Sequence, residues 1–174
     1  IGVEGAYPPF SSVTADGELV GFDIDIAKAL CEQMQAECTL VSQDWDGIIP
    51  ALLARKYDAI VASMSITEER MKKVGFTNKY YDTPAKFARK KGSGIEITAE
   101  GLEGKPVGVQ RATIHDNFLT GEFGDTVEIK RYGSQDEAYL DAVSGRLDLL
   151  MADSVALNDG FLSTENGTDW EYVG

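Results

Sequence analysis

The sequence predicts an α/β protein made of two doubly wound lobes. Short apolar strands alternate with amphipathic helices along its 174 residues, a pattern typical of parallel sheets covered by helices. The chain also contains one strand-and-loop pattern twice, starting at Ile1 and again at Val107. In each copy an apolar strand ends in a polar residue, and open α/β sheets bind ligands beyond the carboxyl ends of their strands. We therefore expect two half-sites that face one another across a cleft.

The repeat consists of two pairs of matching segments. Segment 1–7 (IGVEGAY) matches 107–113 (VGVQRAT), and segment 53–63 (LARKYDAIVAS) matches 143–153 (VSGRLDLLMAD). The polar residues near the strand ends are Glu4 and Ser63 in the first copy, and Gln110 and Asp153 in the second. We expect these four side chains to surround one ligand.

The first copy should begin with a strand over 1–7, which Pro8 ends because proline cannot extend a strand ladder. A turn at Asp16-Gly17 predicts a hairpin over 11–20. The apolar residues that recur every four positions and predict the next helix are Phe22, Ile26, Leu30 and Met34. Asp23 and Asp25 suit the positive N-terminal end of that helix.

Three further elements complete the first copy: a strand over 38–41, a helix that includes Ile49 and Leu53, and a buried strand over 58–62. Asp46 can cap the helix, and Pro50 is tolerated in its first turn. The segment 65–68 (SITE) matches a capping box, which predicts a helix over 68–74.

The second copy repeats this order. Its strands are expected over 107–110, 127–131 and 147–152, and its helices over 113–123 and 134–144. Gly145 ends the second of these helices. Between the copies, segment 83–91 is extended in character and ends at Gly92-Ser93-Gly94. We expect that segment to be the crossover and hinge.

Charge and hydropathy exclude several function classes. Sixteen basic residues against 29 acidic ones give a formal net charge of −13. Nucleic-acid binding is not expected, because phosphate contacts need clusters of Lys and Arg. No apolar run approaches the ~18 residues that span a bilayer, so we expect no direct membrane insertion. The chain opens directly on a strand, which is consistent with a signal peptide that has been removed.

Cys31 and Cys38 leave two interpretations open. They form a disulfide if Cys31 lies late in a helix and Cys38 begins the next strand, which implies an oxidising compartment. Two buried free thiols in a cytosolic protein fit the composition equally well. A metal site is not expected, because the single histidine, His115, does not complete a ligand set.

Arg70 and Asp153 suggest a ligand when they are taken together. Alone, Arg70 is explained as a surface arginine bridged to Glu68 or Glu69, and Asp153 as the N-cap of a helix from Ser154. However, a cation near a helix start opposes the dipole unless it has a fixed anionic partner. An arginine from one lobe and a carboxylate from the other match the two charges of an α-amino acid.

Tyr7 and Trp45 lie in loops beyond strand ends, where they either pack in the core or sandwich a ligand side chain. Aromatic faces also attract cations, by about 0.5–2 kcal/mol each. Glu4, a carboxylate at a strand end, would complement a basic ligand side chain.

The sequence contains none of the usual catalytic or phosphate-binding motifs. His115 has no accompanying Ser, Cys and Asp arrangement, and no Walker or G-x-G-x-x-G motif follows a strand. We interpret His115 as a solvent-exposed or cleft-lining residue at a helix start, and the pairs Asp23/Asp25 and Asp44/Asp46 as caps. We expect no catalytic residue and no cofactor.

Four ordered motifs resemble one known family. These are segments 21–27 (GFDIDIA), 45–50 (WDGIIP), 57–60 (YDAI) and 63–70 (SMSITEER). They resemble the polar amino-acid-binding proteins of bacterial ABC importers (solute-binding protein family 3), above all the lysine/arginine/ornithine and histidine binders. The resemblance implies a periplasmic-binding-protein-like fold and a membrane permease as partner. It also implies a periplasmic location, or an extracellular one with a lipoprotein anchor.

The resemblance also implies a role for individual positions. Arg70 matches the arginine that clamps the ligand carboxylate, and Asp153 matches the aspartate that takes the ammonium. Glu4 falls where basic-amino-acid binders carry an aspartate, which is one methylene shorter. The other positions implied to bind ligand are Tyr7, Trp45, Ser63, Ser65, Gln110, Thr113, Ile114 and His115. Cys31 and Cys38 match the family's disulfide positions.

We therefore expect a receptor that captures arginine, lysine, ornithine or histidine. Lobe 1 is expected over 1–88, without the C-terminal completion that the family resemblance implies, and lobe 2 over 89–174. Two alternatives remain: an enzyme similar to cyclohexadienyl or arogenate dehydratase, which resembles the same fold, and the ligand-binding sensor domain of a receptor.

Overall fold

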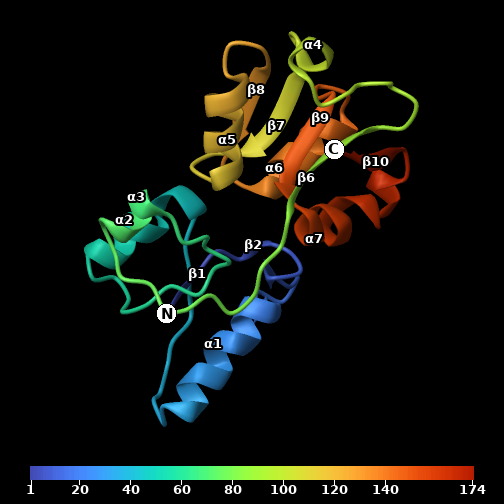
Figure 1. Ribbon diagram of the computed structural model, residues 1–174. Coiled ribbons are helices and arrows are strands. Elements are labelled where there is room, and N and C mark those ends of the chain that lie inside the picture. Colours follow the sequence, from blue (N-terminus) through green and yellow to red (C-terminus); the bar gives the residue numbers. More distant parts are fainter. The chain divides into compact units, whose positions relative to one another are not determined.

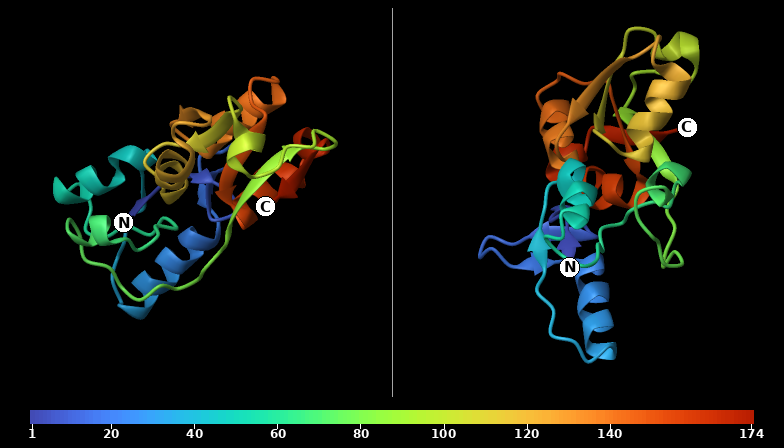
Figure 2. Two further views of the ribbon diagram at one scale, coloured as in Figure 1. Left: turned by 45° about the horizontal axis from the view of Figure 1, so that its top comes forward. Right: turned by 90° about the vertical axis from the view of Figure 1, so that its left-hand side faces the viewer.

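The computed structural model describes residues 1–174, which form two compact units, Ile1–Thr83 and Pro84–Gly174. Each unit has hydrophobic clusters of its own and is described separately. Figures 1 and 2 show the helices and strands of both units.

Unit 1 is built on three short parallel segments. Strand β1 (Gly2–Val3) pairs in parallel with β5 (Val41–Ser42), and Gly2 also forms a parallel bridge with Ile60. The Gly2 amide donates to the Ala59 carbonyl at 2.8 Å, and the Val61 amide donates to the Gly2 carbonyl at 3.0 Å. The strand expected over 58–62 is therefore reduced to a single bridge, while the strand expected over 38–41 begins later, at Val41.

The strand expected over 1–7 is broken at Gly5. This glycine adopts a φ of +82°, which turns the chain out of β1. β2 (Ala6–Tyr7) then joins a separate antiparallel sheet with β3 (Ser11–Val13) and β4 (Leu19–Val20). The hairpin expected around Gly17 is confirmed as the β3–β4 pair.

Helix α1 (Phe22–Gln33) is confirmed, but its buried face is not the expected one. The apolar side chains expected on that face are largely exposed, with Phe22 at 41%, Leu30 at 47% and Met34 at 62%. A strict spacing of four drifts by about 40° per step on a helix of 3.6 residues per turn, so it does not follow one face. The residues that are buried are Asp23, Ile24, Ala27 and Cys31.

The remaining helices of unit 1 are shorter than expected. A 3-10 turn η1 (Trp45–Gly47) leads into α2 (Ile48–Leu53), with Pro50 in its first turn. Asp46 does not cap α2, because it lies within η1 and Gly47 occupies the cap position. Helix α3 (Glu68–Met71) is a single turn capped by Thr67, two residues after the expected Ser65, and does not reach Val74.

Unit 2 contains a five-stranded sheet in the order β10-β6-β9-β7-β8. β7 (Pro106–Gln110) is parallel to both β8 (Glu128–Tyr132) and β9 (Leu149–Asp153), as the sequence predicts. β6 (Ala85–Lys90) and β10 (Trp170–Val173) depart from an all-parallel sheet, since β6 is antiparallel to both of its neighbours. The expected extended segment 83–91 is thus an integral strand of the sheet.

The two long helices of unit 2 confirm the sequence analysis. α5 (Ile114–Phe123) is capped by Thr113, and α6 (Gln135–Val143) by a capping box of Ser134 and Glu137. Helix α7 (Ser154–Leu157) begins at Ser154, as the N-cap interpretation of Asp153 requires. Three further helical turns were not expected: α4 (Ala99–Leu102), the π turn η2 (Asn158–Leu162) and the 3-10 turn η3 (Glu165–Gly167).

Strand β9 shows why the sheet is covered on both faces. Leu149 and Met151 belong to one hydrophobic cluster with Leu119 of α5, while Leu150 belongs to a second cluster with Ala138 of α6. This alternation places successive side chains on opposite faces of the sheet, as a doubly wound arrangement requires.

The sequence repeat corresponds to repeated packing. Gly2 bridges Ile60, and its repeat counterpart Gly108 pairs with Leu150, the counterpart of Ile60. A Cβ on Gly2 would lie 2.5 Å from the Tyr57 ring, and one on Gly108 would lie 2.4 Å from Leu147, the counterpart of Tyr57. In both copies, therefore, the glycine leaves room for the side chain that lies three residues before its pairing partner, Tyr57 in the first copy and Leu147 in the second.

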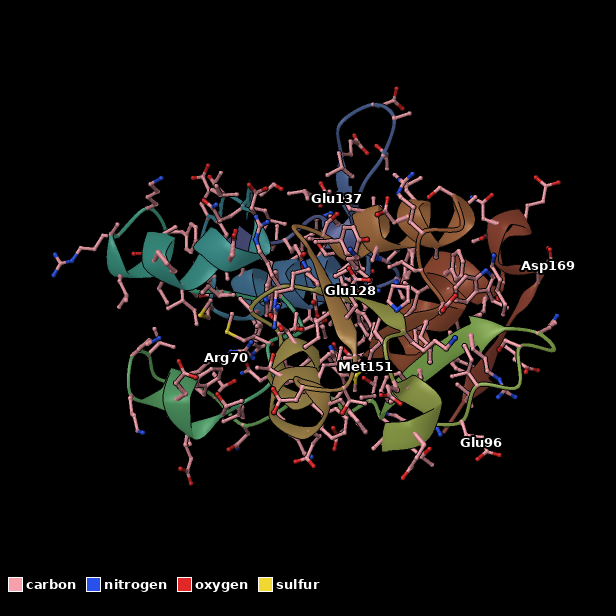
Figure 3. The ribbon with its side chains drawn as sticks, turned by 90° about the horizontal axis from the view of Figure 1, so that it is seen from above. Arg70, Glu96, Glu128, Glu137, Met151 and Asp169 are labelled. Atoms are coloured by element: carbon pink, nitrogen blue, oxygen red, sulfur yellow. A yellow bond between two sulfur atoms is a disulfide. The ribbon has the colours of Figure 1, made fainter.

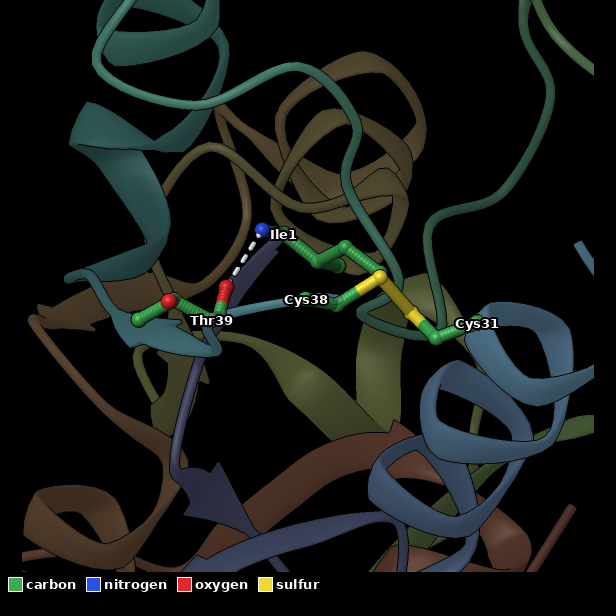
Figure 4. Close-up of a disulfide and its surroundings, with 4 residues drawn as sticks. All are labelled: Ile1, Cys31, Cys38 and Thr39. Atoms are coloured by element: carbon green, nitrogen blue, oxygen red, sulfur yellow. Dashed lines mark hydrogen bonds between the residues drawn. A yellow bond between two sulfur atoms is a disulfide. The ribbon is translucent and has the colours of Figure 1, made fainter. Parts of the chain in front are cut away.

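A disulfide joins Cys31, in the last turn of α1, to Cys38, which confirms that interpretation of the two cysteines (Figure 4). Beside it, the amino group of Ile1 donates to the Thr39 carbonyl at 2.7 Å. None of the helices combines the length and apolar character needed to cross a bilayer.

Replacing Gly108 by alanine should destabilise unit 2. The new Cβ would lie 2.4 Å from Leu147 and 3.2 Å from Leu150, so overpacking should lower the free energy of unfolding by about 1–3 kcal/mol. Gly121→Ala is the matched control, because its Cβ would meet nothing within 4 Å and alanine favours a helix. Equal urea midpoints for the two variants would contradict the packing argument.

Removing the disulfide should also destabilise the protein. The bond closes a loop between residues seven apart, and its loss should lower the free energy of unfolding by about 2.5 kcal/mol. The comparison is urea unfolding of wild type and of the double variant Cys31→Ser/Cys38→Ser, each with and without reductant. Reductant should affect only the wild type, and a wild type insensitive to reductant would contradict the prediction.

Candidate functional site

The polar residues of unit 1 follow the carboxyl ends of its three parallel segments. Glu4 comes directly after β1, Trp45 follows β5, and Ser63 follows the bridge at Ile60. Because parallel segments end at one edge, these residues leave the sheet on the same side. Glu4 is only 7% exposed, so its carboxylate is a buried charge, which requires compensating partners.

Two buried aromatic residues accompany Glu4. Tyr7, in β2, stacks on Phe10 with ring centroids 6.0 Å apart. Trp45 belongs to the hydrophobic cluster of unit 1, and its ring also lies 5.3 Å from the guanidinium carbon of Arg70. The indole therefore packs in the core and also contacts a cation of its own unit, while its contact with a ligand side chain stays a prediction.

Arg70 is a fixed residue rather than a surface one. Its side chain, which Figure 3 labels, extends from α3, and its Nη1 donates to the Ser65 carbonyl at 2.9 Å. Burial lowers the pKa of the guanidinium, and the nearby Glu69 raises it. Glu69 itself pairs with Lys73 at 3.3 Å. Contacts to Ser65 and Trp45 thus hold the guanidinium in one orientation, as bidentate recognition of a carboxylate requires.

Sequence reasoning missed two residues of this edge, Asp23 and Tyr80. Asp23 does not cap α1: it is fully buried and accepts hydrogen bonds from the hydroxyls of Ser63 and Tyr80, both at 2.7 Å. One signal could have revealed it, because Ile24, Ala27 and Cys31 follow an i, i+3, i+7 pattern, and Asp23 lies one turn before Ala27 on the same buried face. Tyr80 carries no comparable signal.

In unit 2, the parallel strands β7 and β9 end at Gln110 and Asp153. Gln110 is 2% exposed and its Nε2 donates to the Gly133 carbonyl at 3.2 Å. Thr113 donates to the Gln110 carbonyl at 2.7 Å and accepts from the Asp116 amide at 3.1 Å. These bonds shape the loop between β7 and α5, on which Ile114 is half-buried at the first position of α5.

Asp153 occupies the N-cap position of α7, yet its side chain makes no capping hydrogen bond. One carboxylate oxygen instead lies 3.7 Å from Nε2 of His115. His115 is only 5% exposed, so the solvent-exposed interpretation is wrong, and its Nε2 has no hydrogen-bond partner. A half-buried carboxylate beside a buried imidazole nitrogen without a hydrogen-bond partner provides a polar site at this edge.

The segment that links the units touches the polar edge of each. In unit 1, the Tyr80 hydroxyl contacts Ser63 and Asp23. In unit 2, the Ser154 amide donates to the Pro84 carbonyl at 2.9 Å, and Ala85 pairs with Asp153.

Each edge carries its own set of polar groups. Unit 1 provides a fixed guanidinium, a buried carboxylate and two aromatic rings, and unit 2 provides a carboxylate beside an imidazole. No group of His, Cys, Asp and Glu side chains is arranged to hold a metal ion.

Comparison with known proteins identifies relatives across the whole chain. An L-arginine-binding protein of Pseudomonas aeruginosa is 52% identical over 175 residues, an alignment that covers 100% of this chain and 68% of the relative. The histidine-binding periplasmic protein of Escherichia coli is 42% identical, with 100% and 67% covered.

Among solved structures, an ancestral arginine-binding protein bound to arginine superimposes with a TM-score of 0.93 at 34% identity. The superposition covers 99% of this chain and 76% of that chain. The periplasmic-binding-protein-like α/β fold expected from the sequence is thereby confirmed. Residues 1–158 match the description "Bacterial extracellular solute-binding proteins, family 3". The chain belongs to the family 3 bacterial extracellular solute-binding proteins.

Proposed function

We propose that this protein is the extracytoplasmic receptor of an ABC importer and that it captures one basic L-amino acid for delivery to a membrane permease. The observation that carries the proposal is the fixed guanidinium of Arg70, which the Ser65 carbonyl and the Trp45 ring hold in unit 1. In unit 2, Asp153 offers a carboxylate that makes no capping hydrogen bond to α7. The relatives named above, which bind L-arginine and histidine, support the same ligand class.

Arg70 is the group for the ligand carboxylate. Its guanidinium is held by the Ser65 carbonyl and the Trp45 ring, and a planar fork held in one place can pair with both carboxylate oxygens. Desolvation on binding strengthens such a pair, because Coulomb attraction grows as the effective dielectric falls.

Asp153 is the group for the ligand ammonium. Ser63 Oγ supplies a second acceptor from unit 1, and the unsatisfied His115 Nε2 is a third. An ammonium carries three donors and no acceptor, so each of these acceptors suits it. The loop that leads from β7 into α5 would lie beside this ammonium, with contacts from Gln110, Thr113 and Ile114.

Glu4 selects the ligand side chain. Its carboxylate, 7% exposed directly after β1, would form a charge-assisted hydrogen bond with a guanidinium or ammonium at the end of an aliphatic chain. Tyr7 and Trp45 would flank the aliphatic part. Among basic amino acids we favour L-arginine, since guanidinium–carboxylate pairing is bidentate and the relative from P. aeruginosa is 52% identical.

The protein is a binding protein rather than an enzyme. Its named relatives are binding proteins, and the polar edges are complementary to the two charges of an intact amino acid. The disulfide agrees with a periplasmic or extracellular location, because such bonds persist in oxidising compartments. Nothing in either unit favours a dehydratase or a sensor over a receptor.

The purified protein should bind basic amino acids selectively in isothermal titration calorimetry. We expect L-arginine to bind with a Kd of about 1 μM or tighter, which corresponds to about −8 kcal/mol. L-lysine, L-ornithine and L-histidine are the other ligands to test. Binding of L-glutamate or L-glutamine without any of the basic amino acids would contradict the proposal.

Replacing Glu4 by glutamine should remove the preference for a cationic side chain. Loss of a charge-assisted hydrogen bond should weaken L-arginine binding by about 10- to 100-fold, while the neutral isostere L-citrulline should be little affected. Glu18→Gln is the matched control, because Glu18 is an exposed glutamate of the same unit. An unchanged ratio of the arginine and citrulline affinities would show that Glu4 does not read the side chain.

A further inference from the structure

Asp23 is a fully buried carboxylate that caps no helix. Its side chain lies in the first turn of α1, where it has no capping hydrogen bond, and it is 0% exposed. Oδ2 accepts from the Ser63 hydroxyl at 2.7 Å, and Oδ1 accepts from the Tyr80 hydroxyl at 2.7 Å. The Tyr80 oxygen in turn accepts from the Ser63 amide at 3.3 Å. Three residues far apart in the sequence thus form a closed ring of hydrogen bonds.

The ring fixes the direction in which Ser63 can hydrogen-bond. A serine hydroxyl has one donor and two acceptor lone pairs. Since the Ser63 hydroxyl donates its hydrogen to Asp23, the Ser63 oxygen can only accept hydrogen bonds from other groups. An acceptor suits an ammonium, which has donors alone.

The ring also holds Ser63 in an uncommon backbone conformation. Ser63 has a φ of +51°, in the left-handed region that residues other than glycine seldom adopt. Both its side chain and its amide are tied down, by Asp23 and by Tyr80. Such conformations persist when the surroundings over-determine them, and they cluster at binding sites.

We propose that Asp23 is a positioning residue of the amino-acid site, which acts by fixing the conformation and hydrogen-bonding direction of Ser63 without touching the ligand. The inference rests on the proposed function, in which Ser63 Oγ accepts from the ligand ammonium. Through Tyr80, the ring also includes the last segment of unit 1, which ends at Thr83.

Burial gives the charged form of Asp23 a free-energy cost. Burial raises the pKa of Asp23, and the hydrogen bonds from Ser63 and Tyr80 lower it less than burial raises it. A carboxyl whose pKa is raised on folding destabilises the fold as the pH rises through that pKa, and the cost vanishes at acid pH. Burial, followed by the Asp23 charge, also raises the pKa of Tyr80, which keeps its hydroxyl a donor.

The first test is Asp23→Asn, which keeps the shape but replaces one acceptor by a donor. The new amide would donate to one of the two hydroxyls and so disturb the ring. With L-arginine as the probe, calorimetry should show affinity about tenfold weaker than wild type, while the melting temperature at pH 7 should not fall. Asp25→Asn is the matched control, because Asp25 is exposed in the same turn of α1; its affinity should be unchanged.

A double-mutant cycle with Ser63→Ala separates positioning from a general structural effect. If Asp23 acts through the Ser63 hydroxyl, Asp23→Asn should cause no further loss of L-arginine affinity in the Ser63→Ala background. An equal tenfold loss in both backgrounds would overturn the proposal, as would wild-type affinity in Asp23→Asn.

A ligand-free measurement keeps this inference distinct from the proposed function. The Cα and Cβ chemical shifts of Ser63 report its left-handed conformation in the unliganded protein. We expect Asp23→Asn to shift them and Asp25→Asn to leave them unchanged; unchanged shifts in Asp23→Asn would also overturn the proposal. Failure of wild type to bind any basic amino acid would instead contradict the proposed function, and the shifts would still decide the role of Asp23.

Discussion

Close parallel pairing around a glycine is the constraint on which both units depend. Gly2 and Gly108 let β1 and β7 approach the segments that contain Ile60 and Leu150, with no room for a Cβ at either glycine. The pairing is parallel, so the polar residues that follow the paired segments leave each sheet at one edge. That register determines where the strand-end candidates lie, namely Glu4, Ser63, Gln110 and Asp153.

The two edges differ in how their polar groups are supported. In unit 1, Arg70 is held by a carbonyl and an indole ring, and Ser63 by the buried Asp23. In unit 2, Asp153 is held away from the helix it precedes and lies beside His115, whose Nε2 has no partner. Unit 1 therefore presents a largely preorganised surface, which reduces the entropy lost on binding.

The sequence alone predicted the repeat, the long helices and the polar strand ends, because each has a local signal. Thr113 and Ser134 start their helices as capping chemistry requires, and the glycine in each copy marks a close approach. Short elements were predicted less well. The strand expected around Ile60 is reduced to a single bridge. Helix α3 is capped by Thr67 and not by the expected Ser65.

What the sequence could not show depends on contacts between distant residues. Asp23 carries the same local signal as a helix-dipole aspartate, and only packing reveals that it meets Ser63 and Tyr80, 40 and 57 residues away. The antiparallel placement of β6 likewise has no local signal, since an extended crossover and a strand have the same pattern. Arg70 was predicted as a ligand group, but not the Trp45 face on which it rests.

A crystal structure with bound L-arginine tests the central claim most directly, namely that the two polar edges together bind one amino acid. We expect the ligand carboxylate on the Arg70 guanidinium, its ammonium within hydrogen-bonding distance of Asp153 and Ser63 Oγ, and its side chain directed to Glu4. A ligand contacted by one unit alone, or one whose ammonium lies away from both Asp153 and Ser63, would contradict that account.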